Sequence, residues 1–292
     1  MHYVIGDVHG CMDEMMLLLK KIERQDPEAK FIFVGDFVDR GPKVFETLKW
    51  AMKNITPDGK YQSVLGNHED MAADWIREYV KWHDRKDGTG YPTYHYDFDD
   101  LMMKKYGNSR WIIPKEKLLP YLEFFENLPL NKKVTVTTKW GKEVTFRIAH
   151  AWHMEKVTEK RKREANLWDR RTHYNSDKEI LLHGHTPTLL PEYYLCMEDN
   201  TQIGRIGYRH MNVNVDGGCV FWDLIGDVPA SLCGICLETF EEFYPRSVLA
   251  QIKKQTKGTA YEDYQEIYAR YQRKTPKIMP YREEMLKFMG KS

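Results

Sequence analysis

The chain has 292 residues, a length that allows one large domain or two smaller ones, each with its own core. Lysine and arginine total 44 against 43 for aspartate and glutamate, and this balance argues against a nucleic-acid partner. The five cysteines are few, odd in number and scattered, which favours a reducing compartment, so we predict a cytoplasmic location. We expect no membrane partner, because no stretch approaches the roughly 20 apolar residues of a membrane helix and the start has no signal-peptide pattern.

Three short apolar runs near the start each end in glycine followed by polar residues. Residues 3–5 precede Gly6-Asp7-Val8-His9-Gly10, residues 31–34 precede Gly35-Asp36, and residues 63–65 precede Gly66-Asn67-His68-Glu69. Runs of this length with flanking glycine predict buried strands. Amphipathic helical patterns fill the two intervals, around residues 15–22 and 44–52. Together they predict a βαβαβ unit whose strand ends carry polar groups, where such sheets place ligands.

The rest of the chain divides into an insert, two more strands and a tail. Aromatic residues recur at near-helical spacing from Glu69 to about Trp82, and we predict a mostly helical insert at about 70–125. Apolar runs at 146–149 and 180–182 then end in histidines. Amphipathic spacing after about Thr259 predicts a helical tail at 251–292, packed on a main domain that spans 1–250.

The polar residues at these strand ends form a ligand set for two metal ions. Two divalent cations held close together need a bridging carboxylate, plus oxygen and imidazole ligands that leave positions for water and substrate. One site is predicted from Asp7, His9 and Asp36, and the second from Asp36, Asn67, His150 and His185, with Asp36 shared. The neutral amide of Asn67 leaves the site a net positive charge, which suits an anionic substrate.

The three blocks at 6–10, 35–41 and 66–69 resemble, in this order, the signature blocks of the phosphoprotein phosphatases. This family includes bacteriophage lambda phosphatase and belongs to the calcineurin-like metallophosphoesterase superfamily. His150 and the block Gly184-His185-Thr186 are similar to the remaining ligands of the family. The resemblance implies an α/β fold of two packed, mixed β-sheets flanked by helices, with a helical insert.

The same resemblance implies a role for each matching residue. The six ligands above bind two divalent ions, with Mn²⁺ as our first choice and iron or zinc as alternatives. Arg40 grips phosphate oxygens with its fork of donors. His68, held by Asp39, protonates the leaving alkoxide while a metal-bridging hydroxide attacks phosphorus in line. A second phosphate-binding arginine is expected between the two late histidines, where we favour Arg170 over Arg171.

The predicted function is the hydrolysis of phosphate monoesters. We favour a serine/threonine protein phosphatase, with a phosphorylated protein or a small phosphomonoester as the substrate. The main alternative is a dinucleoside polyphosphate hydrolase acting on diadenosine tetraphosphate, because Gly10-Cys11 is similar to those enzymes. A phosphodiesterase or nuclease is disfavoured, since Asp39, Arg40 and His68 suit a dianionic monoester. A non-catalytic phosphate-binding regulatory module is the remaining alternative, against which the complete ligand set argues.

Other chemically active residues receive no site role. Cys233-Gly234-Ile235-Cys236 is either half of a zinc site, a redox pair or core packing, and we favour packing because no second pair completes it. Seven histidines are interpreted as ordinary: His2, His83, His95, His153, His173, His183 and His210. The sequence leaves the oligomeric state open.

Overall fold

The computed structural model describes residues 1–85, 89–94, 96–110, 112–171, 174, 176–189, 203–221, 229–257, 264–274 and 280–292. His95, His173 and Cys196 lie outside the described residues. Within the described residues, no helix is both long enough and apolar enough to span a bilayer. The cytoplasmic location stays a prediction.

The first sheet contains the βαβαβ unit that the sequence predicts. Strands β1 (His2–Ile5), β2 (Lys30–Phe33) and β3 (Tyr61–Ser63) pair in parallel, joined by helices α1 (Met12–Gln25) and α2 (Val44–Asn54). Two antiparallel strands, β9 (Gly234–Cys236) and β10 (Glu242–Phe243), complete the order β10-β9-β1-β2-β3. The third strand ends at Ser63 rather than at Leu65, because the Leu65 amide donates instead to the Pro129 carbonyl, outside the sheet.

The second sheet has the order β4-β5-β6-β8-β7 and is also mixed. Its strands are β4 (Asn131–Thr137), β5 (Glu143–Ala149), β6 (Glu179–His183), β7 (Gly207–Arg209) and β8 (Asn212–Asn214). Strands β5, β6 and β8 are parallel, whereas β4 and β7 pair antiparallel at the two edges.

A shared core holds the two sheets together. Alternate side chains of a strand point to opposite faces, so Val4 and Ile32 of the first sheet meet Phe146 and Leu182 of the second. The other face of β1 and β2 packs on α1 through a separate cluster that includes Phe31. Burial on both faces explains why these strands read as short continuous apolar runs.

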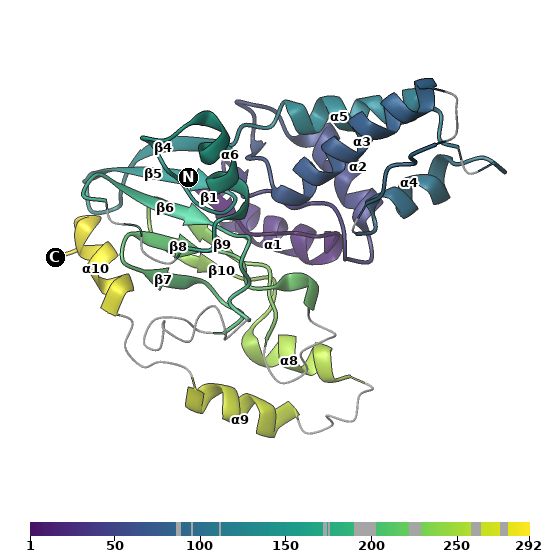
Figure 1. The fold of residues 1–292 in the computed structure, drawn as a ribbon. Helices are drawn as coiled ribbons and strands as arrows, with labels where there is room; N and C mark the ends of the chain where they lie inside the picture. The colour runs from purple at the N-terminus through teal and green to yellow at the C-terminus, as the bar shows by residue number, and fades with distance from the viewer. Residues whose placement is uncertain are drawn as a thin grey trace.

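Helices flank the sheets (Figure 1). Around the candidate insert, α3 (Asn67–Arg85), α4 (Phe98–Tyr106), η1 (Lys115–Lys117) and α5 (Leu119–Glu126) form their own aromatic-rich cluster. The remaining ones are α6 (Glu159–Trp168), η2 (Cys219–Phe221), α8 (Val248–Thr256), α9 (Tyr264–Lys274) and α10 (Pro280–Phe288). Figure 1 shows α10 beside β7, and its Met285 and Leu286 belong to the shared core of the sheets. Two mixed sheets flanked by helices confirm the predicted fold class; the division at residue 250 stays a prediction.

Candidate metal centre

The loops that follow β1 and β2 bring together the first predicted ligands. The amides of Val8 and His9 both donate to the Asp36 carbonyl, at 3.1 and 2.7 Å, which ties the two loops to each other. The Asp36 carboxylate oxygen Oδ2 then lies 3.3 Å from Nε2 of His9 and 3.4 Å from Nε2 of His150. A carboxylate between two imidazoles occupies the position that a bridging ligand needs.

The remaining predicted ligands surround the same carboxylate. The Asn67 amide oxygen lies 2.7 Å from Nε2 of His150 and 3.1 Å from Nδ1 of His185. The His185 backbone amide donates to Asp7 at 3.0 Å, and ligand atoms of Asp7, Asp36 and His150 all lie within 4.8 Å of one another. The structure thus brings all six predicted ligands together, each with at most 7% of its surface exposed.

The donor set fits divalent cations. Nδ1 of His9 lies 2.8 Å from the Val38 carbonyl, and Nδ1 of His150 lies 2.8 Å from the Val34 carbonyl. Because a carbonyl only accepts, Nδ1 carries the proton and each Nε2 keeps a lone pair that faces inward. Asp7 Oδ1 and His185 Nε2 have no hydrogen-bond partner among the described residues, although both are buried. Buried polar atoms without partners are destabilising, and a cation would provide the missing partner.

The electrostatics of the cluster also favour a bound cation. Burial, followed by the carboxylates of Asp216 and Asp36, raises the pKa of Asp7 well above its ordinary value. Burial lowers the pKa of His150 and of His185, so both imidazoles are neutral and able to act as ligands. Crowded buried carboxylates beside neutral imidazoles are the surroundings that a cation stabilises. Asp216, at 4% exposure, is a third buried carboxylate that the sequence analysis missed.

The candidate acid His68 lies in the first turn of α3 and is fixed at three points. Its backbone amide donates to Asp36 Oδ1 at 3.0 Å, and its Nδ1 lies 2.6 Å from Asp39 Oδ2. The Tyr94 hydroxyl donates to the same Asp39 oxygen at 2.8 Å and to the His68 carbonyl at 3.3 Å. The sequence missed Tyr94, because one tyrosine in a tyrosine-rich stretch carries no signal of its own.

The two candidate phosphate-binding arginines lie beside different ligands. Arg40 is exposed, and its Nη1 lies 2.7 Å from Nε2 of His9. Arg170 is exposed and donates to the His185 carbonyl at 3.3 Å and to Thr186 Oγ1 at 2.9 Å. Arg171 instead pairs with Asp169 at 3.4 Å. Arg170 therefore lies beside a candidate ligand, and its choice over Arg171 as a phosphate-binding residue stays a prediction.

Glu69 supports the loop that carries Asp36. Its fully buried carboxylate accepts the backbone amides of Asp36 at 2.7 Å, Phe37 at 2.7 Å and Val38 at 3.1 Å. Burial and the neighbouring Asp36 charge raise the pKa of Glu69 to about 8. The sequence included Glu69 in the third block, but nothing in the pattern indicated this supporting position.

Two groups without a predicted site role stay outside the cluster. His183 is buried against Trp152, with ring centres 5.9 Å apart, and its Nδ1 lies 3.1 Å from the Gly184 carbonyl. Cys233 packs in the core between the sheets, whereas Cys236 packs in the cluster on α1, and both are free thiols. The placement of the cysteines on opposite faces is that of core residues.

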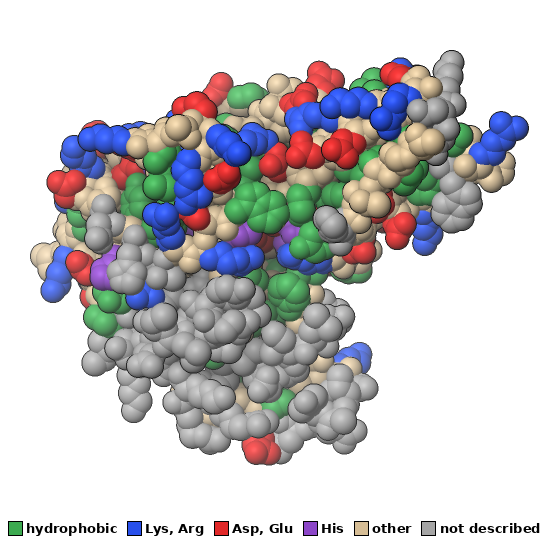
Figure 2. Space-filling view, viewed as in Figure 1, with side chains coloured by type: hydrophobic (Ala, Val, Ile, Leu, Met, Phe, Trp, Pro, Cys, Tyr) green, Lys and Arg blue, Asp and Glu red, His purple; other side chains and the backbone are tan. Residues whose placement is uncertain are grey.

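The surface around the site is mixed in character. Figure 2 shows histidine atoms near the middle of one face, bordered by Lys or Arg and by hydrophobic side chains.

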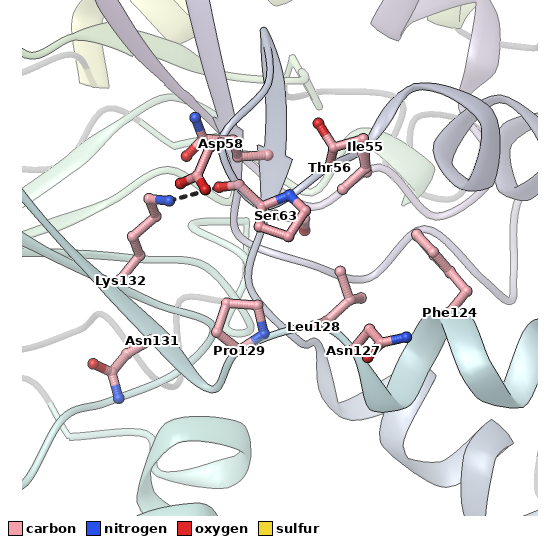
Figure 3. Close-up of a pocket in the computed structure, with 12 residues that line it drawn as sticks. Ile55, Thr56, Asp58, Ser63, Phe124, Asn127, Leu128, Pro129, Asn131 and Lys132 are labelled. Carbon is pink, nitrogen blue, oxygen red and sulfur yellow. Dashed lines mark hydrogen bonds between the residues drawn. The ribbon is translucent and has the colours of Figure 1, made fainter.

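A separate hollow of about 250 Å³ lies beside the end of β3 and the turn before β4 (Figure 3). Leu128, Pro129 and Phe124 line it, and Lys132 donates across it to the Pro57 carbonyl at 2.9 Å. None of the candidate ligands lines this hollow.

Comparisons with known proteins place this geometry in a family. A symmetrical bis(5'-nucleosyl)-tetraphosphatase of Neisseria gonorrhoeae (strain NCCP11945) is 43% identical over 68 residues, 23% of this chain and 24% of that protein. One of Methylobacillus flagellatus is 37% identical over 81 residues, 28% of each chain. The chain therefore spans about a quarter of the length of the curated relatives it matches.

A solved metallophosphoesterase from Sphaerobacter thermophilus superposes with a TM-score of 0.45 at 15% identity, over 94% of this chain and 99% of that one. The family model for calcineurin-like phosphoesterases matches residues 3–215, well over half of the chain, and includes every candidate ligand from Asp7 to His185. The chain belongs to the calcineurin-like phosphoesterase family, a family of metal-dependent phosphoesterases.

Proposed function

We propose that the chain is a metal-dependent phosphoesterase that hydrolyses dinucleoside polyphosphates, cleaving diadenosine tetraphosphate into two nucleoside diphosphates. The cluster of six buried ligands, with the Asp36 carboxylate at its centre, carries the phosphoesterase part of the proposal. The choice of substrate is supported by the curated relatives, which are named symmetrical bis(5'-nucleosyl)-tetraphosphatases. It is the substrate class that the sequence alone placed second.

Each part of the site has a distinct task in this proposal. Two divalent ions, with manganese as our first choice, supply Lewis acidity and offset the charge of the phosphates. Arg40 and Arg170 bind phosphate oxygens from the surface side of the ligands. His68, oriented by its 2.6 Å contact with Asp39, donates the proton to the leaving oxygen.

Two exposed aromatic rings beside the site support a nucleotide substrate. Tyr96 is 39% exposed, its ring centre lies 4.5 Å from that of His68, and the Arg40 guanidinium carbon lies 5.4 Å from it. Trp168 is 44% exposed, and its ring centre lies 6.0 Å from that of His185. Nucleobases stack on exposed aromatic rings, with about 1 to 3 kcal/mol gained per base. Two bases joined by a phosphate chain would use both rings.

A serine/threonine phosphatase, of the lambda phosphatase type or otherwise, is the second candidate. The observation in its favour is the short contact of His68 with Asp39, reinforced by the Tyr94 hydroxyl. A serine alkoxide is a much poorer leaving group than a nucleoside diphosphate, so a positioned acid accelerates monoester hydrolysis more. The third candidate, a regulatory module, would bind phosphate groups at the same site without hydrolysing them.

The test uses metal-stripped chain resupplied with manganese and three substrates: diadenosine tetraphosphate, a phosphoserine peptide and an aryl phosphate. We expect two ADP per dinucleotide cleaved, and at least a hundredfold loss of turnover in Asp36→Asn and His68→Asn. Tyr96→Ala and Trp168→Ala should raise KM for the dinucleotide by about tenfold and leave the aryl phosphate unaffected. Tyr91→Ala is the matched control, because Tyr91 is 41% exposed but packs on Trp82, away from the ligands.

The outcomes separate the three candidates. Faster cleavage of the phosphopeptide than of the dinucleotide, with no effect of the two aromatic substitutions, would establish the protein phosphatase instead. Absence of turnover on all three substrates, with manganese bound, would leave the binding module.

A further inference from the structure

A second group of potential metal ligands lies outside the candidate metal centre. His153 and Glu155 stand in the loop after β5, and Glu179 is the first residue of β6. One ligand atom from each of the three lies within 4.8 Å of the others. None of these residues belongs to the six ligands of the candidate metal centre, so the group is a separate constellation.

The His153 imidazole is buried without hydrogen bonds. Only 3% of its side chain is exposed, and neither ring nitrogen has a hydrogen-bond partner among the described residues. Its Nε2 lies 3.9 Å from Glu155 Oε1, too far for a hydrogen bond but on the side of the carboxylates. Burial, followed by the charge of Arg147, lowers the pKa of His153, so the ring is neutral and keeps a lone pair for a ligand. A buried polar ring in this state requires an explanation.

The two carboxylates differ in a way that suits capture of an ion. Glu179 is buried and held by the Tyr174 hydroxyl at 2.6 Å and by Arg147 Nε at 3.2 Å. Such hydrogen bonds orient a ligand in the manner of the outer partners of metal sites. Glu155, with 65% of its side chain exposed, contacts Arg147 at 3.2 Å and is less constrained by packing than Glu179.

We propose that His153, Glu155 and Glu179 bind one transition-metal cation, for which zinc is the reference ion. One imidazole and two carboxylates are ligand types that zinc accepts, whereas calcium and magnesium prefer oxygen alone. Three protein ligands leave one position of a tetrahedral ion open to water. Binding releases Arg147 from the exposed Glu155, while Arg147 keeps its contacts with Asn131 at 3.1 Å and with the two oxygens of Glu179 at 3.2 and 3.3 Å.

The test counts zinc ions on the full chain by native mass spectrometry after saturation with Zn²⁺ and removal of loosely bound metal. We expect His153→Gln to bind one zinc ion fewer than the wild type. The control is His83→Gln, the same substitution at a histidine of α3, which should bind as many zinc ions as the wild type. The aryl phosphatase rate of manganese-loaded His153→Gln should be unchanged. Glu155→Gln, altered at an exposed side chain that cannot compromise folding, should weaken binding of this one zinc by about tenfold or more.

Two results would overturn the proposal: an equal zinc count in the wild type and in folded His153→Gln, or an unaltered zinc affinity in Glu155→Gln. The count is repeated in Asp36→Asn, which weakens the candidate metal centre. The difference of one zinc caused by His153→Gln should persist there, so the outcome does not depend on the proposed phosphoesterase activity.

Discussion

The most informative single substitution is Glu69→Gln, because this carboxylate holds the loop that presents Asp36. Its two oxygens accept three backbone amides, those of Asp36, Phe37 and Val38, and it is fully buried. A glutamine of the same shape has one oxygen and one NH₂ group in their place. In one orientation the NH₂ group faces the Asp36 amide, and in the other it faces the amides of Phe37 and Val38. The NH₂ group is itself a donor that then has no acceptor, so either orientation leaves at least two buried donors unsatisfied: the NH₂ group and one or two backbone amides.

The size of the effect follows from the number of donors that lose their acceptor. Each unsatisfied buried donor destabilises a protein by about 1 to 3 kcal/mol, so two predict a loss of about 2 to 6 kcal/mol. This is a large part of the roughly 5 to 15 kcal/mol that a typical domain has. Because the displaced loop carries Asp36, manganese affinity should fall as well.

Urea unfolding of the metal-free chain at about pH 4.5 measures the loss of stability, because at that pH the raised pKa of Glu69 adds almost no cost of proton uptake on folding. Titration with manganese at neutral pH measures the affinity. Asp74→Asn is the matched control, since it makes the same carboxylate-to-amide change on the same helix at a side chain that is 69% exposed. That variant should lose less than about 1 kcal/mol. A loss of less than about 1 kcal/mol in Glu69→Gln, with normal manganese affinity, would refute the supporting role of the carboxylate.

Three further predictions concern other contacts. Tyr94→Phe removes the hydroxyl that donates to Asp39, and we expect turnover to fall about tenfold with the unfolding midpoint almost unchanged, as measured by steady-state kinetics and urea unfolding. Gly184→Ala would place a methyl group 1.9 Å from Asp7 Oδ1, so calorimetry should show weaker manganese binding at normal secondary structure by circular dichroism. Burial alone would raise the pKa of Glu238, but hydrogen bonds from the first residue of β1 outweigh it and lower that pKa. The Glu238 carboxylate thus stabilises the fold at neutral pH, and this stabilisation is lost as the pH falls through its folded-state pKa. Urea unfolding of Glu238→Gln should therefore show a free energy of unfolding about 1 kcal/mol below the wild type at neutral pH and almost equal to it in acid.

The elements that the sequence predicted correctly are those in which one local pattern suffices. Strands β1, β2 and β6 read as apolar runs because both of their faces are buried, and each strand ends within two residues of a glycine. Parallel strands place their carboxyl ends at one edge of the sheet, so residues far apart along the chain can be grouped by the strand that each one follows. That rule groups Asp7 with Asp36 in the first sheet and His150 with His185 in the second. The two groups meet because the sheets pack face to face through their shared core.

The residues that the sequence missed act through contacts between segments. Tyr94 reaches Asp39 across 55 residues, and Glu69 reaches Phe37 across 32 residues. His153 looked ordinary because its neighbour Glu179 lies in β6, a separate segment of the chain. A pattern in one segment carries no information on such pairs, since their proximity depends on how the segments pack.

Backbone strain identifies the same site by an independent route. Among the described residues, seven other than glycine have positive φ, and five of them are candidate site residues: His9, Asp36, Asp39, Arg40 and His185, with φ from 41 to 69°. The left-handed conformation costs such residues about 1 to 2 kcal/mol each, which glycine would avoid. A chain shaped by stability alone would place glycine there, as it does at Gly10 and Gly35 beside them. His9 contacts the Asp36 carboxylate and Arg40 in turn contacts His9, while Asp39 contacts His68. Glycine has no side chain to make these contacts, so the strain is retained at the positions that build the site.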